Sequence, residues 1–330
     1  MKKKVFITGG AGYIGSRLVP ILLKKNYYVT VYDTFYFGNT LEKNKNLKII
    51  KGDIRNTKLL TKKCKNHDIF LHLACISNDT SFELNNKLSK SINFDCFKPM
   101  VMGAKASHIK RFIYASSSSV YGLSKKRNVK EDHPLLPLTL YNKYKGMCEP
   151  ILLKHTDENF EGVIFRPATV CGYAPRMRLD LSVNILTNFA YHKKIINVFG
   201  GSQLRPNLHI LDYCDAVLKL MKAPSHKIKN QIFNVGHQNM SINKLALRVK
   251  KIISKKTSTN IKVIKTKSND KRSYHINSDK IFKMLGFKAK RKVDNAITEI
   301  YNAFRKNKIP KSFEDLNYFN VKKMLKLKIK

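Results

Sequence analysis

The chain of 330 residues is 43% hydrophobic and 10% aromatic, which suits a globular protein with one large core or two smaller ones. No apolar run approaches the roughly 20 residues that a transmembrane helix needs, so we expect no membrane span. Glycines break the apolar stretch behind the N-terminal lysines, so we expect no signal peptide and place the protein in the cytoplasm. The net charge of +42 would suit nucleic-acid binding, but the lysines are scattered without one basic block, which argues against a nucleic-acid partner.

The first 33 residues carry the pattern of a dinucleotide-binding unit. An apolar run at 5–7 leads into the glycine-rich turn TGGAGYIG, an apolar helical pattern follows, and a second apolar run ends in an acid. The first glycine of the spacing GxxGxxG would allow the tight turn, the second the approach of backbone to a pyrophosphate, and the third close packing of the helix on the sheet. We expect the cofactor to bind at Gly9, Gly12, Tyr13, Ile14 and Gly15.

Asp33 closes the second apolar run about 18 residues after the last glycine, where a carboxylate can bind both hydroxyls of an adenosine ribose. Because this carboxylate would repel a 2′-phosphate, it favours NAD over NADP, although Arg17 leaves NADP open. The N-terminus of the helix offers free N–H groups and a positive dipole end to the phosphates.

Further apolar runs alternate with helical patterns along the chain, and this alternation predicts a Rossmann-like, doubly wound parallel sheet of about seven strands. The additional strands are expected at 47–50, 68–74, 111–115, 162–165 and 231–235, and helices at 57–66, at 83–107 and from Tyr141 onward. We expect Pro150 to kink the last of these helices.

The alternation lapses after about residue 168, which predicts a second, smaller and discontinuous domain. We assign residues 1–167 and 207–238 to the cofactor domain, and residues 168–206 and 239–330 to the substrate domain. The tail from Lys311 is basic and amphipathic and is expected to form a surface helix.

Residues at the ends of the third and fourth strands, together with Lys145, complete the expected cofactor site. Asp53 can bond an adenine amino group, and Ile54 can pack on the ring. Leu73 and Ala74 close the fourth strand, where small residues allow a cofactor to approach the backbone.

Tyr141 and Lys145 lie four residues apart in a predicted helix and therefore share one face. An ammonium beside a phenol favours the phenolate, which can exchange a proton with a sugar hydroxyl while hydride moves to or from a nicotinamide. Among four serines after the fifth strand we choose Ser117 as the hydroxyl that binds the substrate oxygen. Tyr144 is a rival tyrosine, but residue 148 is not a lysine.

The six cysteines form no CxxC pair and show no metal-ligand spacing with histidines. We expect them to be reduced, small, buried residues and expect no metal site.

These motifs resemble the extended short-chain dehydrogenase/reductase family, and within it the NAD-dependent nucleotide-sugar epimerase/dehydratase branch. The resemblance covers nearly the whole chain and is closest to the UDP-sugar 4-epimerases. It rests on TGGAGYIG, Asp33, GDIR at 52–55, HLAC at 72–75, SSSSVYG at 116–122, Tyr141 with Lys145, RPATVCG at 166–172 and the segment 200–212.

The resemblance implies a nucleotide-diphosphate sugar as substrate. Arg205 and Arg272 are similar to the two family arginines that meet the substrate diphosphate, and Asn184 is similar to a substrate-binding asparagine. Arg176 and Arg178 are further candidates for lining the site. The family also implies a homodimer through helices near 90–107 and 141–155, and a role in cell-surface polysaccharide biosynthesis.

Two departures from the family pattern bear on the reaction. The 4,6-dehydratases carry an acidic pair, or threonine with glutamate, in the strand-end cluster where this chain has Ser118 and Ser119. Without that acid, water elimination lacks its proton carrier, so the sequence resembles the epimerases more closely. Cys171 replaces a tyrosine of many relatives.

The expected mechanism is epimerisation, most simply at C4. Tyr141 takes a proton from the sugar hydroxyl, hydride passes to NAD, and the keto sugar rotates before hydride returns to its other face. Alternatives are a nucleotide-sugar reductase or dehydrogenase, a 4,6-dehydratase and, outside the enzymes, a cofactor-sensing or RNA-binding protein on the same fold.

Overall fold

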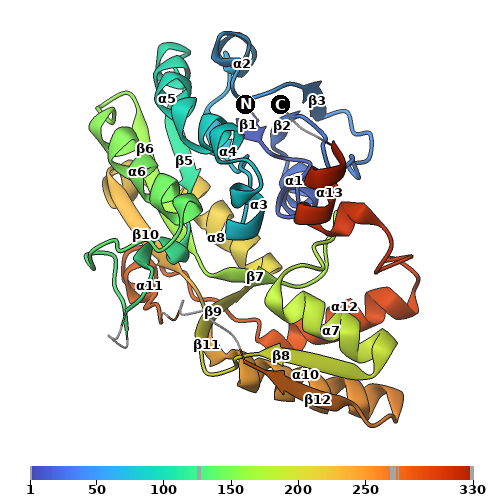
Figure 1. Cartoon of the computed structure of the whole chain (residues 1–330). Helices are drawn as coiled ribbons and strands as arrows, with labels where there is room; N and C mark the ends of the chain where they lie inside the picture. The colour runs from blue at the N-terminus through green and yellow to red at the C-terminus, as the bar shows by residue number, and fades with distance from the viewer. Residues whose placement is uncertain (1, 125–127, 268–272, 274, 328–330) are drawn as a thin grey trace.

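Seven parallel strands form the main sheet of the computed structural model, which describes residues 2–124, 128–267, 273 and 275–327 (Figure 1). Their order is β10-β6-β5-β4-β1-β2-β3. The strands are β1 (Lys4–Thr8), β2 (Tyr28–Asp33), β3 (Leu47–Lys51), β4 (Ile69–His72), β5 (Arg111–Ala115), β6 (Glu161–Pro167) and β10 (Gln231–Val235). The strand order reverses between β1 and β4, which places a crevice at their carboxyl ends. The predicted doubly wound sheet is confirmed.

Alternating side chains of β1 explain why helices cover both faces of this sheet. Val5 and Ile7 pack with α1 (Gly15–Lys24), α8 (Ile210–Lys222) and α11 (Asp279–Leu285), whereas Phe6 points into the opposite core. The opposite core is covered by α2 (Thr57–Cys64), α5 (Phe97–Ala106) and α6 (Leu140–Lys154). Strands that are buried on both faces are continuous apolar runs, which is why the sequence located the inner strands. The edge strand β3 is different, because Lys48 and Ile49 are exposed.

The region expected as one helix at 83–107 is helical over most of its length but follows a separate short helix, α3 (Asp79–Glu83). It consists of α4 (Asn86–Lys90), the π-helical turn Ser91–Asp95 and α5. Asn78 and Asn85 start α3 and α4, because their side chains accept the backbone N–H groups of Ser81 and Leu88. Helix α6, by contrast, continues through Pro150 to Lys154.

The lower half of the molecule in Figure 1 contains two small sheets and three longer helices. Strands β7 (Thr169–Cys171), β9 (Leu204–His209) and β11 (Gln238–Ser241) form one sheet, and β8 (Ile195–Phe199) pairs with β12 (Lys262–Thr266). Helices α7 (Ser182–Lys193), α10 (Ile242–Thr257) and α12 (Val293–Arg305) share a separate hydrophobic core with them. The short α9 (Ser225–Ile228) precedes β10.

Two segments that the predicted division assigned to the substrate domain pack on the main-sheet half. Helix α11 joins the core beneath β10, and α13 (Asn320–Leu327) returns to the upper half, where it lies beside α3 (Figure 1). Met324 of α13 is buried in the same core as Phe6. The predicted tail helix therefore exists, and its apolar side packs on the main-sheet half. The division into a cofactor domain and a substrate domain stays a prediction, from which α11 and α13 depart.

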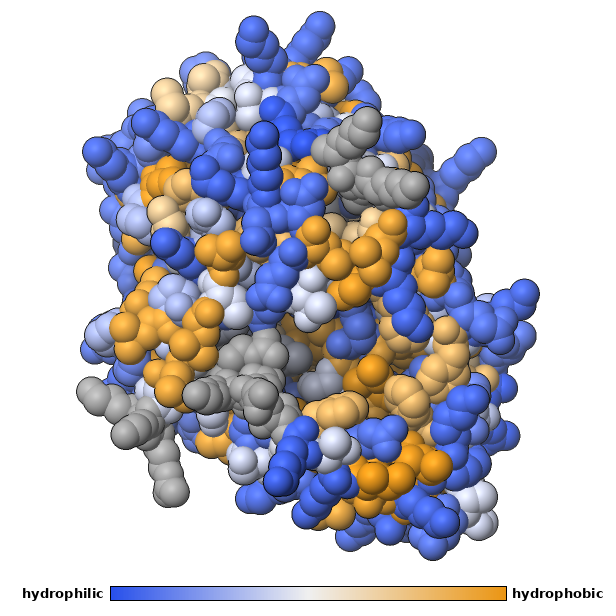
Figure 2. Space-filling model, in the orientation of Figure 1, coloured by the Kyte–Doolittle hydropathy of each residue, from blue (hydrophilic) through white to orange (hydrophobic). Residues whose placement is uncertain are grey.

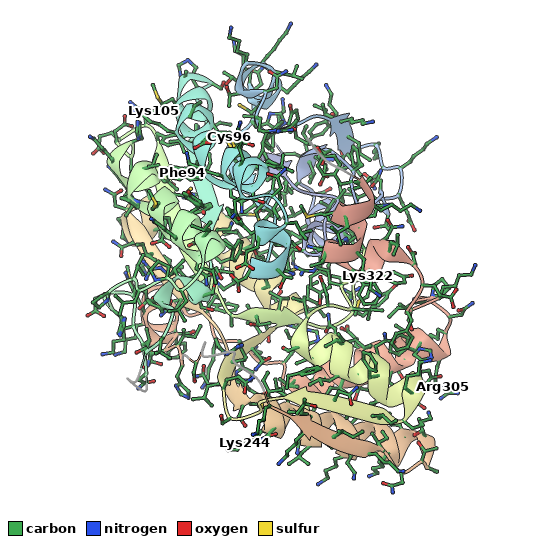
Figure 3. All side chains as sticks on the ribbon, in the orientation of Figure 1. Phe94, Cys96, Lys105, Lys244, Arg305 and Lys322 are labelled. Carbon is green, nitrogen blue, oxygen red and sulfur yellow. The ribbon has the colours of Figure 1, made fainter. Side chains whose placement is uncertain are left out.

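Basic residues are spread over the molecule rather than gathered at one place. Figure 2 shows hydrophilic side chains over both halves of the visible face. Lys105, Lys244, Arg305 and Lys322 come from α5, α10, α12 and α13 and lie far apart in Figure 3. Within the described residues, no helix combines the length and apolarity needed to cross a membrane.

Candidate active site

A cavity of about 530 Å³ opens at the carboxyl ends of the main strands, where the strand order reverses. Its wall includes the ends of β2, β4, β5 and β6, and residues of β7 and β9 from the lower half. The cavity therefore lies where open α/β sheets bind dinucleotides, with a second lobe closing over it.

The glycine turn forms one side of the cavity and needs its glycines for different reasons. Gly9 has φ +73°, and a Cβ atom there would lie 2.6 Å from the backbone nitrogen of Ala74. Gly12 donates its N–H to the carbonyl of Gly9 over 3.2 Å. Gly15 is not in the wall, but a Cβ atom would meet the carbonyl oxygen of Gly10 at 2.1 Å, so only glycine lets α1 begin there.

Asp33 and Asp53 lie in the same wall, as predicted for a dinucleotide site. The carboxylate of Asp33 accepts N–H groups from Ala11 at 3.0 Å and Phe35 at 2.8 Å, while its burial raises its pKa. Burial also acts to raise the pKa of Asp53, but hydrogen bonds from Arg55, one of 2.7 Å, outweigh it and lower the pKa. The remaining predicted cofactor contacts Ile14, Ile54, Leu73 and Ala74 also line the cavity.

Tyr13 connects the glycine turn to the lower half. Its hydroxyl donates to the carbonyl of Gly172 over 2.6 Å and accepts the amide of Asn184 over 3.1 Å, and burial raises its pKa. Asn184 is fully buried outside the cavity wall, and its amide also bonds the backbone of Gly172 and Arg178. The structure therefore places Asn184 behind Tyr13 and outside the cavity wall, and its role in substrate binding stays a prediction.

Tyr141, Lys145 and Ser117 are brought together in the cavity wall. Lys145 is 3% exposed, and its ammonium donates to the carbonyl of Ala115 over 2.8 Å. The Ser117 hydroxyl lies 2.7 Å from that of Ser119, which donates to Asn142 over 2.5 Å. One strand end and one helix thus present a phenol, an ammonium and a hydroxyl to the same space.

Tyr144 is excluded from this space by its position on α6. Its ring stacks on those of Phe82 at 5.7 Å and Phe94 at 5.2 Å, and it does not line the cavity. The structure thus separates the two candidate tyrosines, which the sequence distinguished only by the spacing to Lys145.

Three arginines of the lower half line the cavity, namely Arg176, Arg178 and Arg205. Arg178 forms an ion pair with Asp180 at 2.9 Å and donates to Ser77 at 2.9 Å. Burial acts to lower the pKa of Arg178, but the charge of Asp180 outweighs it and raises the pKa. Arg272, predicted to meet a substrate diphosphate, lies outside the described residues.

Sequence reasoning missed the part of the wall that comes from the C-terminal tail. Asn320 and Met324 of α13 line the cavity, and Asn320 bonds Ser77, Arg176 and Asp180. The amphipathic pattern was the available signal for a docked helix, but nothing in it identified the surface on which the helix docks.

Two carboxylates beyond those at the cofactor end also line the cavity, and both have partners. Asp79 accepts the hydroxyl of Thr139 over 2.5 Å, and Asp180 is paired with Arg178. Ser118 and Ser119 stand at the strand end instead of an acid. No group of three or more potential metal ligands occurs in the part of the chain that the structure describes.

Comparisons with known proteins agree with this geometry. Residues 5–236 match the model of the NAD dependent epimerase/dehydratase family. The UDP-glucose 4-epimerase of Lactobacillus helveticus is 27% identical over 94% of this chain and 99% of its own, and the human dTDP-D-glucose 4,6-dehydratase is 26% identical over 92% and 91%. A crystal structure of UDP-glucose 4-epimerase from Thermotoga maritima with UDP-glucose has a TM-score of 0.82 at 22% identity, over 92% of this chain and 99% of that one.

The fold and the site define an enzyme that binds a dinucleotide at a Rossmann sheet and has a tyrosine–lysine pair beside it. The chain belongs to the NAD dependent epimerase/dehydratase family. The predicted family and the predicted cofactor, NAD, are confirmed.

Proposed function

We propose that the protein is a nucleotide-sugar epimerase that inverts a sugar carbon, most simply C4, through a keto intermediate. The observation that carries the proposal is the strand end beside Tyr141, where Ser118 and Ser119 replace an acid. The nearby carboxylate of Asp79 is bonded to Thr139. A site with a phenol and hydroxyls but no acid at this strand end suits hydride chemistry better than elimination of water.

The residues of the chain have separate tasks in this reaction. Bound NAD supplies the acceptor, and later the donor, of the hydride. Tyr141 as phenolate takes the proton of the sugar hydroxyl, Lys145 favours the phenolate by its charge, and Ser117 binds the same oxygen. Arg205, together with the predicted Arg272, holds the substrate diphosphate while the sugar turns.

The test is to incubate the pure protein with UDP-, GDP-, CDP- and dTDP-sugars without added cofactor and to follow products by chromatography and mass spectrometry. We expect one new peak of unchanged mass, whose inverted carbon is identified by NMR. Loss of water would identify a dehydratase. A change of two hydrogens that requires added cofactor would identify a reductase or dehydrogenase, and no change with any sugar would favour a sensing or binding role.

We also propose that the enzyme is a homodimer that pairs α5 and α6 of two chains. These helices contact each other on the outside of the sheet, and Met102 and Met147 are 51% and 39% exposed on them. Sedimentation equilibrium should give twice the mass of 38.0 kDa, whereas a single-chain mass would contradict the proposal.

Location in the cytoplasm, a role in surface polysaccharide synthesis and the lack of a nucleic-acid partner remain predictions. The dispersed basic residues in Figure 3 support the last of these. Salt-dependent binding to random RNA would contradict it.

A further inference from the structure

Arg176 is the buried cation of the cavity whose guanidinium is only partly bonded. The residue is 4% exposed and lines the cavity, and its guanidinium lies over the ring of Phe37 at 4.2 Å. Nη2 donates to the side chain of Asn320 over 2.6 Å. Nε is buried and has no hydrogen-bond partner among the described residues.

The other buried arginines that the structure describes have an ion-pair partner that Arg176 lacks. Arg166 is paired with Glu149 at 2.6 Å, and Arg178 with Asp180 at 2.9 Å. No carboxylate within the described part of the chain forms an ion pair with Arg176, and burial together with the charge of Arg178 lowers its pKa to about 9. The carboxylates of Asp180 and Asp33 favour the charge of Arg176 from nearby but form no ion pair with it. A buried cation without a directly bonded counterion is unfavourable, so this position suits an anion that enters from outside.

The position of Arg176 indicates which anion. Its backbone N–H donates to the hydroxyl of Ser16 over 3.2 Å, in the first turn of α1. The free N–H groups and dipole of that helix end suit a phosphate. The carboxylate of Asp33 faces the same region and disfavours a phosphate on the ribose 2′-oxygen.

We propose that Arg176 binds the diphosphate of NAD from the side opposite the glycine turn, and that Asn320 of the C-terminal helix holds it there. The guanidinium would present Nε and an Nη to phosphate oxygens, the paired geometry for which arginine is suited. The cofactor would then lie between α1 and the segment that contains Arg176, and the hydrogen bond to Asn320 of α13 would hold this clamp of two segments in place. This clamp explains how NAD can stay bound through repeated turnovers.

The experiment measures NAD binding directly, so it is independent of which reaction the enzyme performs. NAD is removed from the wild type and from Arg176→Gln, and its dissociation constant is measured by calorimetry, with bound nucleotide after gel filtration as a second readout. We expect Arg176→Gln to weaken NAD binding by about 10- to 100-fold, because one charge-assisted contact is lost. Asn320→Ala keeps the charge and should weaken binding by less.

Arg248→Gln is the matched control, because Arg248 is an exposed arginine of α10 paired with Asp294 far from the cavity. It should leave the dissociation constant of NAD unchanged. If Arg176→Gln does not fold, Arg176→Lys keeps the charge without the paired geometry and should still weaken NAD binding several-fold.

Three results would overturn the proposal. One is a folded Arg176→Gln or Arg176→Lys protein that binds NAD within twofold of the wild type. Another is a loss of NADP binding with unchanged NAD binding, which would place the 2′-phosphate at Arg176. The third is a loss of UDP binding alone, which would assign Arg176 to the substrate.

Discussion

Two tyrosines three residues apart on α6 show how position decides chemistry at the scale of a residue. Tyr141 lines the cavity with Lys145, whereas Tyr144 is stacked between two phenylalanines. A proton carrier must reach both the substrate and the charge that tunes it, and only Tyr141 shares its space with an ammonium.

We therefore expect Tyr141→Phe to lower kcat by about 10²- to 10⁴-fold, because the general base is lost while the fold is kept. Bound NAD should be retained, as measured by its absorbance after denaturation. Tyr144→Phe is the control and should keep a kcat near that of the wild type. If Tyr144→Phe lowered kcat more than Tyr141→Phe, the assignment of the proton carrier to Tyr141 would be wrong.

Gly9 combines a left-handed backbone with a close contact, and the two costs can be separated. Gly9→Ala must accept φ +73° and place a Cβ atom 2.6 Å from backbone, whereas Gly286→Ala has φ +65° with open space around it. Gly286→Ala should cost about 1 kcal/mol of unfolding free energy, and Gly9→Ala clearly more, with loss of NAD binding. Equal losses in urea titrations would show that the contact with Ala74 is unimportant.

At the level of helices and strands, a buried ion pair joins α6 to β6 near the serines that follow β5. Glu149 and Arg166 are each 3% exposed, and Glu149 also accepts the hydroxyl of Ser116 over 2.6 Å. Burial acts to lower the pKa of Arg166, but the hydrogen bonds that its guanidinium donates to Glu149 outweigh burial and raise the pKa. The pair holds α6, which carries Tyr141, against β6, and the bond from Ser116 links the same helix to the end of β5, which Ser117 follows.

Removing one partner of this pair should be more harmful than removing both. We expect Arg166→Met to lower the unfolding free energy by about 3–5 kcal/mol, since it leaves a buried carboxylate unpaired, and Glu149→Met with Arg166→Met to regain part of that loss. The exposed pair of Arg248 and Asp294 provides the comparison, and Arg248→Met should cost less than about 1 kcal/mol. Similar costs for both arginines in chemical denaturation would contradict this account.

At the scale of the whole molecule, the two halves are joined around the cavity by polar contacts. Arg17 of α1 bonds Glu299 of α12 at 3.2 Å, and Tyr13 bonds Gly172. These contacts fix the lower half over the cofactor site, so the cavity depends on the integrity of the entire fold.

Stability of the whole fold should decline in mild acid because histidines are buried in their neutral form. His72 is 3% exposed and lies 2.7 Å from the hydroxyl of Thr8, and burial lowers its pKa well below the usual value. The unfolded chain binds this proton below about pH 6.5 and the folded chain does not, so stability is full above that pH and falls below it, by up to about 1.4 kcal/mol per pH unit for each such histidine.

Melting temperatures between pH 7.5 and pH 5 measure this effect. His72→Asn should flatten the decline, while His226→Asn, at an exposed site on α9, should keep the wild-type slope. An unchanged slope in His72→Asn would show that other groups govern the acid limit.

The seven strands, the glycine turn, Asp33 and the pair of Tyr141 with Lys145 could all be predicted from the sequence. These features are local: strands in the middle of the sheet are apolar runs, and a turn with positive φ favours glycine. The same local information identified the family and its cofactor.

Which residues complete the cavity depended on how distant segments pack in the folded chain. Asn184 lies behind Tyr13, whereas Asn320 and Met324 reach the cavity from the C-terminal tail, and Asn320 bonds Arg176 there. Such contacts join residues more than 100 positions apart, and a hydrophobic pattern records that a helix is amphipathic but not the surface on which it docks. The break before α4 is marked by the cap Asn85, whose side chain accepts the N–H of Leu88 in the folded chain.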